Sequence, residues 1–312
     1  MRDPTCNASP SPFRFELTAR LCPGCGSADG RPFAAANVDS EALNSFAFAS
    51  RKQPEYMHHA LLVCRVCDLL YASPCPPREA LEAAYRDAAF DASDESGFAA
   101  LTYGGFLPRV SAQLTDRRGA LDIGTGDGAF LQQLLNHGFS DVVGVEPSAA
   151  PVRAAHPRVA SLIRHAPFRA TDFAPGSMQL VTCFQTIEHV YDPLVLCRET
   201  FELLRPGGAL FIVCHNRRAP LARVMGFKSP IFDIEHLQLF SPRSIEALLL
   251  RAGFSRIELH RVVNRYPLNY WASLFPFPRS VKPRALELLR ESRVGRVMLS
   301  APVGNLAAIA HR

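Results

Sequence analysis

The sequence predicts an α/β protein, in which a doubly wound, mostly parallel sheet follows a small cysteine-bearing module. Three observations support this fold class. Short apolar runs alternate with helical stretches from residue 119 onward, a glycine-rich turn follows the first run, and two C-x-x-C pairs precede it. Short strands that alternate with helices of roughly 10 residues are typical of a parallel sheet covered on both faces.

The apolar runs define the strands that we expect, and the periodic stretches between them define the helices. Strands are expected at 120–123, 142–145, 180–184 and 210–214, with two late strands at 256–262 and 306–310. Helices are expected at 129–136, 193–204 and 242–252, with earlier ones beginning at Arg78 and covering 106–115. Ser241 is expected to cap the helix that begins at Pro242, whereas the stretch 91–97 is expected to be flexible.

Composition excludes several classes of protein. The 312 residues are 48% hydrophobic and 20% charged, which suits one large or two ordinary soluble domains and excludes a disordered chain or a fibre. Nucleic-acid-binding proteins usually carry a strong excess of basic residues, and the net charge of this chain is only +5. The charge therefore disfavours a nucleic-acid partner. No apolar run approaches the roughly 18 residues of a membrane span. The polar, proline-rich start lacks a signal-peptide core, so we expect a cytoplasmic protein with reduced thiols.

The chain divides into three parts by composition. We expect a flexible leader at 1–20, a zinc-binding module at 21–77 and the α/β domain at 78–312, with a run of prolines at the second boundary. Residues 263–302 form a long insertion between the two late strands, in which aromatic residues are followed by basic ones. This insertion could be a lid over a bound acceptor molecule, a contact in an oligomer, a peripheral membrane patch or a helical cover on the sheet.

Four of the nine cysteines form two pairs, Cys22 with Cys25 and Cys64 with Cys67, separated by 38 residues. Four thiolates suit a closed, tetrahedral structural zinc site. Two unrelated pairs or a redox pair are the alternatives, and His58 or His59 could replace one cysteine as a ligand. Cys183, Cys197 and Cys214 lie in apolar surroundings and are expected to be buried small hydrophobes.

The most informative segment is the glycine-rich turn at 121–128, which reads LDIGTGDG. Glycines let a backbone approach a ligand closely, and the turn directs amide groups and a helix N-terminus toward it. Glu146 closes the next strand, 18 positions after Gly128, where a carboxylate can accept both hydroxyls of a ribose. The spacing alone also permits the G-x-G-x-x-A pattern of a nicotinamide-dependent dehydrogenase.

Further motifs distinguish these alternatives. Asp122 precedes the first glycine by two residues, the segment TCFQTIEHV lies at 182–190, and LLRPGG follows at 203–208. Together with the glycine-rich turn, this ordered set closely resembles the class I S-adenosylmethionine-dependent methyltransferases over roughly residues 100–260. The resemblance implies a Rossmann-like, seven-stranded sheet whose last strand is antiparallel.

The resemblance also implies roles for individual residues. Glu146 would bind the ribose hydroxyls of the methyl donor, and Gln185 would lie beside the donor. The acid that usually holds the adenine is missing at 165–168, so Phe168 is the alternative contact. The residues implied to face the methionine part of the donor are Asp122, Gly124, Thr125, Gly126 and Gly128.

The N-terminal cysteine pattern followed by this domain resembles a bacterial group that includes methyltransferases of nucleotide-linked deoxysugars, surface polysaccharides and natural products. The resemblance implies S-adenosylmethionine and structural zinc as cofactors and a small-molecule or glycan-type acceptor. An RNA methyltransferase and a donor-binding regulatory protein without turnover are the alternatives.

Two histidines are candidates for the catalytic base. Methyl transfer to oxygen or carbon needs a proton removed, usually by histidine or a carboxylate. His236 lies between the fifth strand and the next helix, close to Asp233 and Glu235, and His189 follows the fourth strand. We expect His236 to be the base, with His189 as the second choice. Arg217 and Arg218 could bind an acidic acceptor or lie in a solvated loop.

Overall fold

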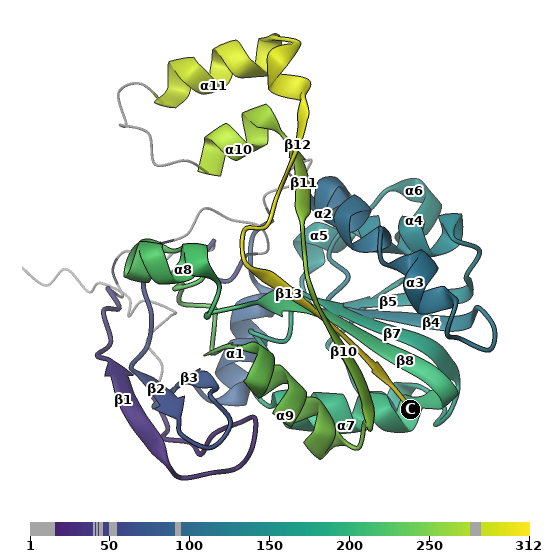
Figure 1. The fold of residues 1–312 in the computed structure, drawn as a ribbon, viewed down its shortest axis with the longest axis horizontal. Helices are drawn as coiled ribbons and strands as arrows, with labels where there is room; N and C mark the ends of the chain where they lie inside the picture. The colour runs from purple at the N-terminus through teal and green to yellow at the C-terminus, as the bar shows by residue number, and fades with distance from the viewer. Residues whose placement is uncertain are drawn as a thin grey trace, which may run out of the picture.

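The fold is that of a computed structural model, which describes residues 16–39, 41, 43, 46–49, 55–90, 95–274 and 282–312. Its centre is a seven-stranded sheet in the order β10-β13-β8-β7-β4-β5-β6 (Figure 1). Strand β13 runs antiparallel to both of its neighbours, while β4 to β8 are parallel, as predicted for the class. The strands are β4 (Arg118–Ile123), β5 (Ser140–Glu146), β6 (Ile163–His165), β7 (Met178–Phe184), β8 (Leu204–His215), β10 (Arg256–Arg261) and β13 (Asn305–His311).

Helices cover both faces of this sheet, because alternate strand residues bury their side chains on opposite faces. On one face, Leu121, Val181 and Ile212 pack with the helices α7 and α9. On the other, Ala120, Leu180 and Phe211 pack with α2, α3 and α4. The helices are α1 (Arg78–Arg86), α2 (Glu95–Gly104), α3 (Leu107–Ser111), α4 (Ala129–Asn136), α5 (Ala149–Ala154), α6 (Pro157–Ala160), α7 (Pro193–Leu203), α8 (Pro220–Met225), α9 (Pro242–Ala252), α10 (Leu268–Leu274) and α11 (Lys282–Glu291), with short 3-10 turns η1 (Ala170–Asp172), η2 (Gly226–Lys228) and η3 (Val294–Arg296).

Most predicted elements of the α/β domain agree with the structure to within a few residues. The cap on α9 is confirmed, because the Ser241 hydroxyl accepts a hydrogen bond from the Ser244 amide at 3.3 Å. Cys183, Cys197 and Cys214 are buried, as expected for small apolar residues. The expectation of a flexible stretch at 91–97 is wrong for residues 95–97, which begin α2; residues 91–94 lie outside the described part. Helix α2 forms because Ala99, Ala100 and Tyr103 bury one of its faces.

The N-terminal module forms a second, antiparallel sheet in the order β1-β2-β3-β9. Its first three strands are β1 (Gly30–Ala34), β2 (Leu61–Cys64) and β3 (Leu70–Ala72), but β9 (Gln238–Leu239) comes from the α/β domain. Leu70 pairs with Leu239 and Tyr71 pairs with Gln238. The sheet therefore crosses the boundary that the sequence places after residue 77.

Arg20 reinforces this junction and shortens the predicted leader. Its guanidinium donates hydrogen bonds to the carbonyl oxygens of Ala72, Tyr191 and Leu237, each at 2.9 Å. Thr18 also pairs with Cys75 through two backbone hydrogen bonds of 2.9 and 3.0 Å. Residues 18–20 therefore belong to the junction, and residues 1–15 of the predicted leader lie outside the described part.

The described parts of the predicted insertion, 263–274 and 282–302, form an arm that projects away from the sheet (Figure 1). Strands β11 (Asn264–Pro267) and β12 (Met298–Ala301) form an antiparallel ribbon that carries α10 and α11. In the figure the two helices lie at the far end of the ribbon, not over the sheet. The arm is thus not a helical cover for the sheet. Within the described residues, no helix combines the length and apolar character that a membrane crossing needs.

Candidate active site and metal centre

The glycine-rich turn connects β4 to α4 and depends on Gly124. Gly124 has a φ of +72°, and a Cβ atom there would lie 2.3 Å from the Thr186 hydroxyl. The turn is held against β5 because the amides of Gly124 and Thr125 both donate to the Val145 carbonyl, at 3.0 and 3.1 Å. Gly126, with a φ of +58°, faces open space, so the tip of the turn leaves room for a ligand.

Glu146 lies at the end of β5, directly across from this turn. One carboxylate oxygen accepts the Gly126 amide and the other accepts the Ser148 amide, each at 2.9 Å. Burial raises the pKa of Glu146, and these backbone hydrogen bonds act in the opposite direction. The remaining lone pairs of the two oxygens can accept ligand hydroxyls, which suits the role implied for Glu146.

Asp122 is buried in β4 and is held by two threonines. Thr182 and Thr125 donate hydrogen bonds to its two carboxylate oxygens, at 2.6 and 2.7 Å. Burial raises the pKa of Asp122 to about 6, although both hydroxyls lower it. The two threonines therefore fix the orientation of the carboxylate beneath the glycine-rich turn.

Gln185 and Phe168 are the two remaining residues implied to bind the donor. Gln185 adopts a φ of +50° immediately after β7, and its side-chain nitrogen is buried with no hydrogen-bond partner among the described residues. A buried donor of this kind fits a polar ligand that would accept from it. Phe168 lines a cavity of about 250 Å³ together with Arg78 and Glu82 of α1.

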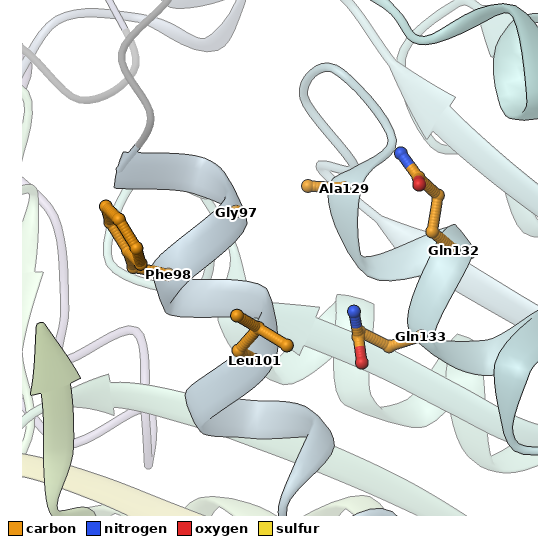
Figure 2. Close-up of a pocket in the computed structure, with 6 residues that line it drawn as sticks. All are labelled: Gly97, Phe98, Leu101, Ala129, Gln132 and Gln133. Atoms are coloured by element: carbon orange, nitrogen blue, oxygen red, sulfur yellow. The ribbon is translucent and has the colours of Figure 1, made fainter. Parts of the chain in front are cut away.

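A second cavity, of about 340 Å³, lies between α2 and α4 (Figure 2). Its lining includes Ala129, the first residue after the glycine-rich turn, and the side chains of Gln132 and Gln133, which extend from α4 into the gap. The Ser96 hydroxyl donates to the Asp127 carboxylate at 2.7 Å, so α2 is attached to the turn. None of the residues implied to bind the donor lines this cavity.

The two predicted catalytic histidines lie side by side. The ring centroids of His189 and His236 are 4.9 Å apart. One ring nitrogen of each histidine and one carboxylate oxygen of Glu235 all lie within 4.8 Å of one another. His236 Nδ1 lies 2.8 Å from the Ile231 carbonyl oxygen. Since a carbonyl only accepts, Nδ1 carries the proton in the neutral ring, and Nε2 is the basic nitrogen. His215, at the end of β8, adds a third imidazole 5.1 Å from the His236 ring.

Tyr85 of α1 is a site residue that the sequence did not reveal. Its hydroxyl lies 3.0 Å from His189 Nδ1 and donates to the Glu235 carbonyl at 3.2 Å. Its own carbonyl accepts from the Ser148 hydroxyl at 2.6 Å, next to Glu146. Burial, and then the carboxylates of Glu235, Asp233 and Glu188, raise the pKa of Tyr85 well above its usual range, so the phenol stays protonated. Tyr85 therefore connects the histidines to the side of the site that holds Glu146.

The four paired cysteines converge into one buried cluster. The sulfur atoms of Cys22 and Cys67 are 3.5 Å apart, as are those of Cys25 and Cys64, and all four lie within 4.8 Å of one another. Sulfurs bound tetrahedrally to zinc at about 2.3 Å would be separated by about 3.8 Å, so the cluster fits such an ion. His58 and His59 are not part of it. The residue after each pair, Gly26 or Asp68, has a positive φ of +72° or +67°, which closes both turns in the same way.

Asp68 also determines the position of the two arginines that could have bound an acidic acceptor. Arg217 donates to the Asp68 carbonyl at 2.8 Å and to its carboxylate, and Arg218 donates to the same carboxylate at 3.1 Å. Both guanidinium groups are thus engaged within the protein. They join the second cysteine pair to the end of β8.

Comparisons with known proteins identify the family. A family model described as a methyltransferase domain matches residues 97–259, just over half of the chain. The chain therefore belongs to this family of methyltransferase domains, which confirms the predicted class of enzyme.

Curated relatives match a smaller share of the chain. It is 27% identical over 169 residues to a ubiquinone biosynthesis O-methyltransferase of Psychrobacter arcticus, covering 48% of this chain and 65% of the relative. It is 33% identical over 114 residues to the protein of the same name from Pseudomonas aeruginosa, covering 34% of this chain and 49% of the relative. The chain thus spans less than two thirds of the length of these relatives.

Solved structures of methyltransferases align with about two thirds of the chain. An S-adenosylmethionine-dependent methyltransferase of Archaeoglobus fulgidus is 16% identical, with a TM-score of 0.47, over 70% of this chain and 97% of that one. One from Mesorhizobium loti is 22% identical, with a TM-score of 0.41, over 66% of this chain and 97% of that one.

We predict that Glu188 makes stability depend on pH. Glu188 is fully buried, one of its carboxylate oxygens accepts the His215 amide, and the other has no partner among the described residues. Burial raises its pKa to about 7. The folded state therefore binds the proton of the Glu188 carboxyl group more tightly than the unfolded state does. The contribution of this proton to the free energy of unfolding is full below about pH 4 and is lost as the pH rises through about 7.

Glu188→Gln should remove this dependence. Relative to the wild type, its free energy of unfolding should increase by roughly 3 kcal/mol between pH 4 and pH 8, measured by urea denaturation. Glu246→Gln, at an exposed site on α9, is the control and should show almost no such change. A difference between Glu188→Gln and wild type that is the same at both pH values would contradict the prediction.

Proposed function

We propose that this chain transfers a methyl group from S-adenosylmethionine to oxygen or carbon of a small-molecule or glycan-type acceptor, such as a nucleotide-linked sugar. The observation that carries the proposal is the convergence of His189, Glu235 and His236, together with the link from Tyr85 to Ser148. A proton acceptor is what oxygen and carbon nucleophiles need. The names of the curated relatives, ubiquinone biosynthesis O-methyltransferases, support transfer to oxygen.

Residues on the donor side would bind and orient S-adenosylmethionine. Glu146 would accept the ribose hydroxyls, the backbone around Gly126 and the carboxylate of Asp122 would face the methionine end, and Gln185 would donate from its unpartnered side-chain nitrogen. Phe168 would contact the adenine. The donor supplies a methyl group already activated by the positive charge on sulfur, so the protein mainly has to align it with the acceptor.

Residues on the acceptor side would remove the proton. His236 Nε2 is the proposed acceptor of that proton, because the Ile231 carbonyl holds the hydrogen on Nδ1. Glu235 lies close enough to stabilise the imidazolium that forms. Tyr85 would position His189, since its hydroxyl contacts that ring and the Glu235 carbonyl.

The most informative test of this function uses labelled S-adenosylmethionine. Purified protein should bind the donor in calorimetry and should transfer the label to one fraction of a lysate separated into sugars, lipids and RNA. The proposal expects the label among sugars or other small molecules. Absence of donor binding would refute it. Donor binding without transfer to any fraction would favour a regulatory protein, and label in RNA would identify an RNA methyltransferase.

We predict that His236→Ala lowers turnover by about 100-fold or more while donor affinity stays nearly unchanged, because general base catalysis typically contributes this much. Turnover is measured with the accepting fraction at saturation, and donor affinity by calorimetry. Glu146→Ala is the matched comparison and should weaken donor binding first. If His236→Ala retains near-normal turnover, His236 is structural, and His189 becomes the candidate.

We also propose that the four-cysteine cluster holds one structural zinc ion. Purified protein should contain about one zinc per chain, measured by plasma mass spectrometry. Cys22→Ser or Cys64→Ser should reduce the zinc content and destabilise the N-terminal sheet more than donor binding. Cys75→Ser alters a buried cysteine outside the cluster and should keep the metal. If a variant in which all four of these cysteines are replaced still contains about one zinc per chain, the assignment is wrong.

A further inference from the structure

The net positive charge of the chain is concentrated in the insertion at 263–302. This segment contains seven of the 34 basic residues and two of the 29 acidic ones, so its own formal net charge is 7 − 2 = +5. The rest of the chain contains 27 basic and 27 acidic residues and is therefore neutral as a set. Such a separation of charge along a chain suggests a partner that carries negative charge.

Exposed cations and exposed aliphatic side chains occur together in the arm. The exposed basic residues are Arg265, Arg284, Arg290, Arg293 and Arg296. The exposed aliphatic residues are Leu288 (70%), Val294 (59%), Val297 (50%) and Leu299 (42%). Each of these valines directly follows an arginine in the chain, and α11, which carries Leu288, lies at the far end of the arm (Figure 1). The arm thus presents both apolar and cationic groups to its surroundings.

The arm is attached through α2 to the donor side of the site. The Tyr270 hydroxyl donates to the Glu95 carboxylate, and the Arg265 amide donates to the Thr102 hydroxyl at 3.2 Å. Helix α2 is itself joined to the glycine-rich turn by the hydrogen bond from Ser96. A surface bound by the arm would therefore lie in a defined position relative to the site.

The exposed side chains of the arm distinguish between anionic partners. Single-stranded nucleic acids are usually bound by aromatic rings that stack on the bases. The described aromatic rings of the arm, Tyr266, Tyr270 and Trp271, instead pack on one another, with centroid distances of 4.5, 5.2 and 6.5 Å. Leucine and valine side chains beside arginines suit the boundary between the headgroups and the acyl chains of a bilayer. A second copy of the arm would bring like charges together.

We propose that the arm binds the surface of an anionic lipid bilayer. The exposed leucine and valine side chains enter the headgroup region, and the exposed arginines pair with lipid phosphates. An anionic surface attracts each nearby cation, so the concentration of positive charge in the arm strengthens binding. This inference goes beyond the proposed function, because none of these side chains belongs to the donor side or the acceptor side of the site.

The test uses the single tryptophan of the chain, Trp271, which lies in α10 on the arm. The full-length protein is mixed with vesicles of phosphatidylcholine alone, or of phosphatidylcholine and phosphatidylglycerol. It should float with the anionic vesicles, with an affinity at least about 10-fold higher than for the neutral ones, and the Trp271 emission should shift to shorter wavelength. Equal affinity for both kinds of vesicle, or no binding to either, overturns the inference. Flotation without any change in Trp271 emission places the contact outside the arm and also overturns it.

Paired arginine variants test the contribution of charge. Arg293→Gln combined with Arg296→Gln should weaken binding to anionic vesicles by about 10-fold or more, because each cation near such a surface typically contributes about 5-fold. Arg153→Gln combined with Arg251→Gln removes the same charge from exposed sites on α5 and α9 and is the control. Unchanged affinity in the arm variant, or an equal loss in the control, overturns the inference.

Leu288→Gln tests the apolar contact in the same assay. It should weaken binding to anionic vesicles by about 5-fold or more, because the side chain no longer gains from burial in the headgroup region. Leu250→Gln, at an exposed site on α9, is the control and should leave the affinity unchanged. Thermal denaturation followed by circular dichroism verifies that each variant is folded. Unchanged affinity in Leu288→Gln overturns the inference.

Two further measurements identify the other possible partners. If oligouridine binds through Arg293 and Arg296 and the anionic vesicles do not bind, the arm is a nucleic-acid surface and the inference is overturned. A dimer in analytical ultracentrifugation that Leu288→Gln dissociates, without vesicle binding, identifies a contact between copies and also overturns it. None of these readouts depends on methyl transfer, so failure of the proposed function would leave this test intact.

Discussion

The guanidinium of Arg20 is the point where three distant segments of the chain meet. It binds the carbonyls of Ala72, Tyr191 and Leu237, which belong to the N-terminal sheet, to the loop after β7 and to the segment before β9. Five directional donors on one planar group make such a three-way contact possible, and lysine could not reproduce it. Burial lowers the pKa of Arg20 from its usual value, but the group remains charged at neutral pH.

This contact matters because the segment that carries Glu235 and His236 has little regular structure of its own. Strand β9 is two residues long and gains its partners from β3, while the Leu237 amide donates to the Glu188 carbonyl at 2.9 Å. The acceptor side of the proposed site therefore depends on the N-terminal module. The donor side, by contrast, is formed within the α/β domain, by β4, β5 and the turn between β4 and α4.

The sequence predicted the parts of the protein that local patterns determine. Apolar runs and periodicity predicted six of the seven strands of the central sheet and the helices α4, α7 and α9, but not β6, α2, α5 or α6. The glycine-rich turn predicted the region around Glu146, and the paired spacing predicted the four-cysteine cluster. It missed features that depend on contacts between distant residues. Tyr85 and His189 are 104 positions apart, and β9 is too short for any periodicity to indicate it. The role of Asp68 was not predicted, because its pairing with Arg217 spans 149 positions.

The claim that the N-terminal module positions the acceptor side can be tested most directly by hydrogen exchange on Arg20→Ala. The claim predicts that the amides of 70–72 and 237–239 exchange at least about 10-fold faster than in the wild type, because local opening there becomes easier. The amides of 122–128, in β4 and the glycine-rich turn, should keep their protection. Unchanged protection at 237–239, or an equal loss at 122–128, would contradict the claim.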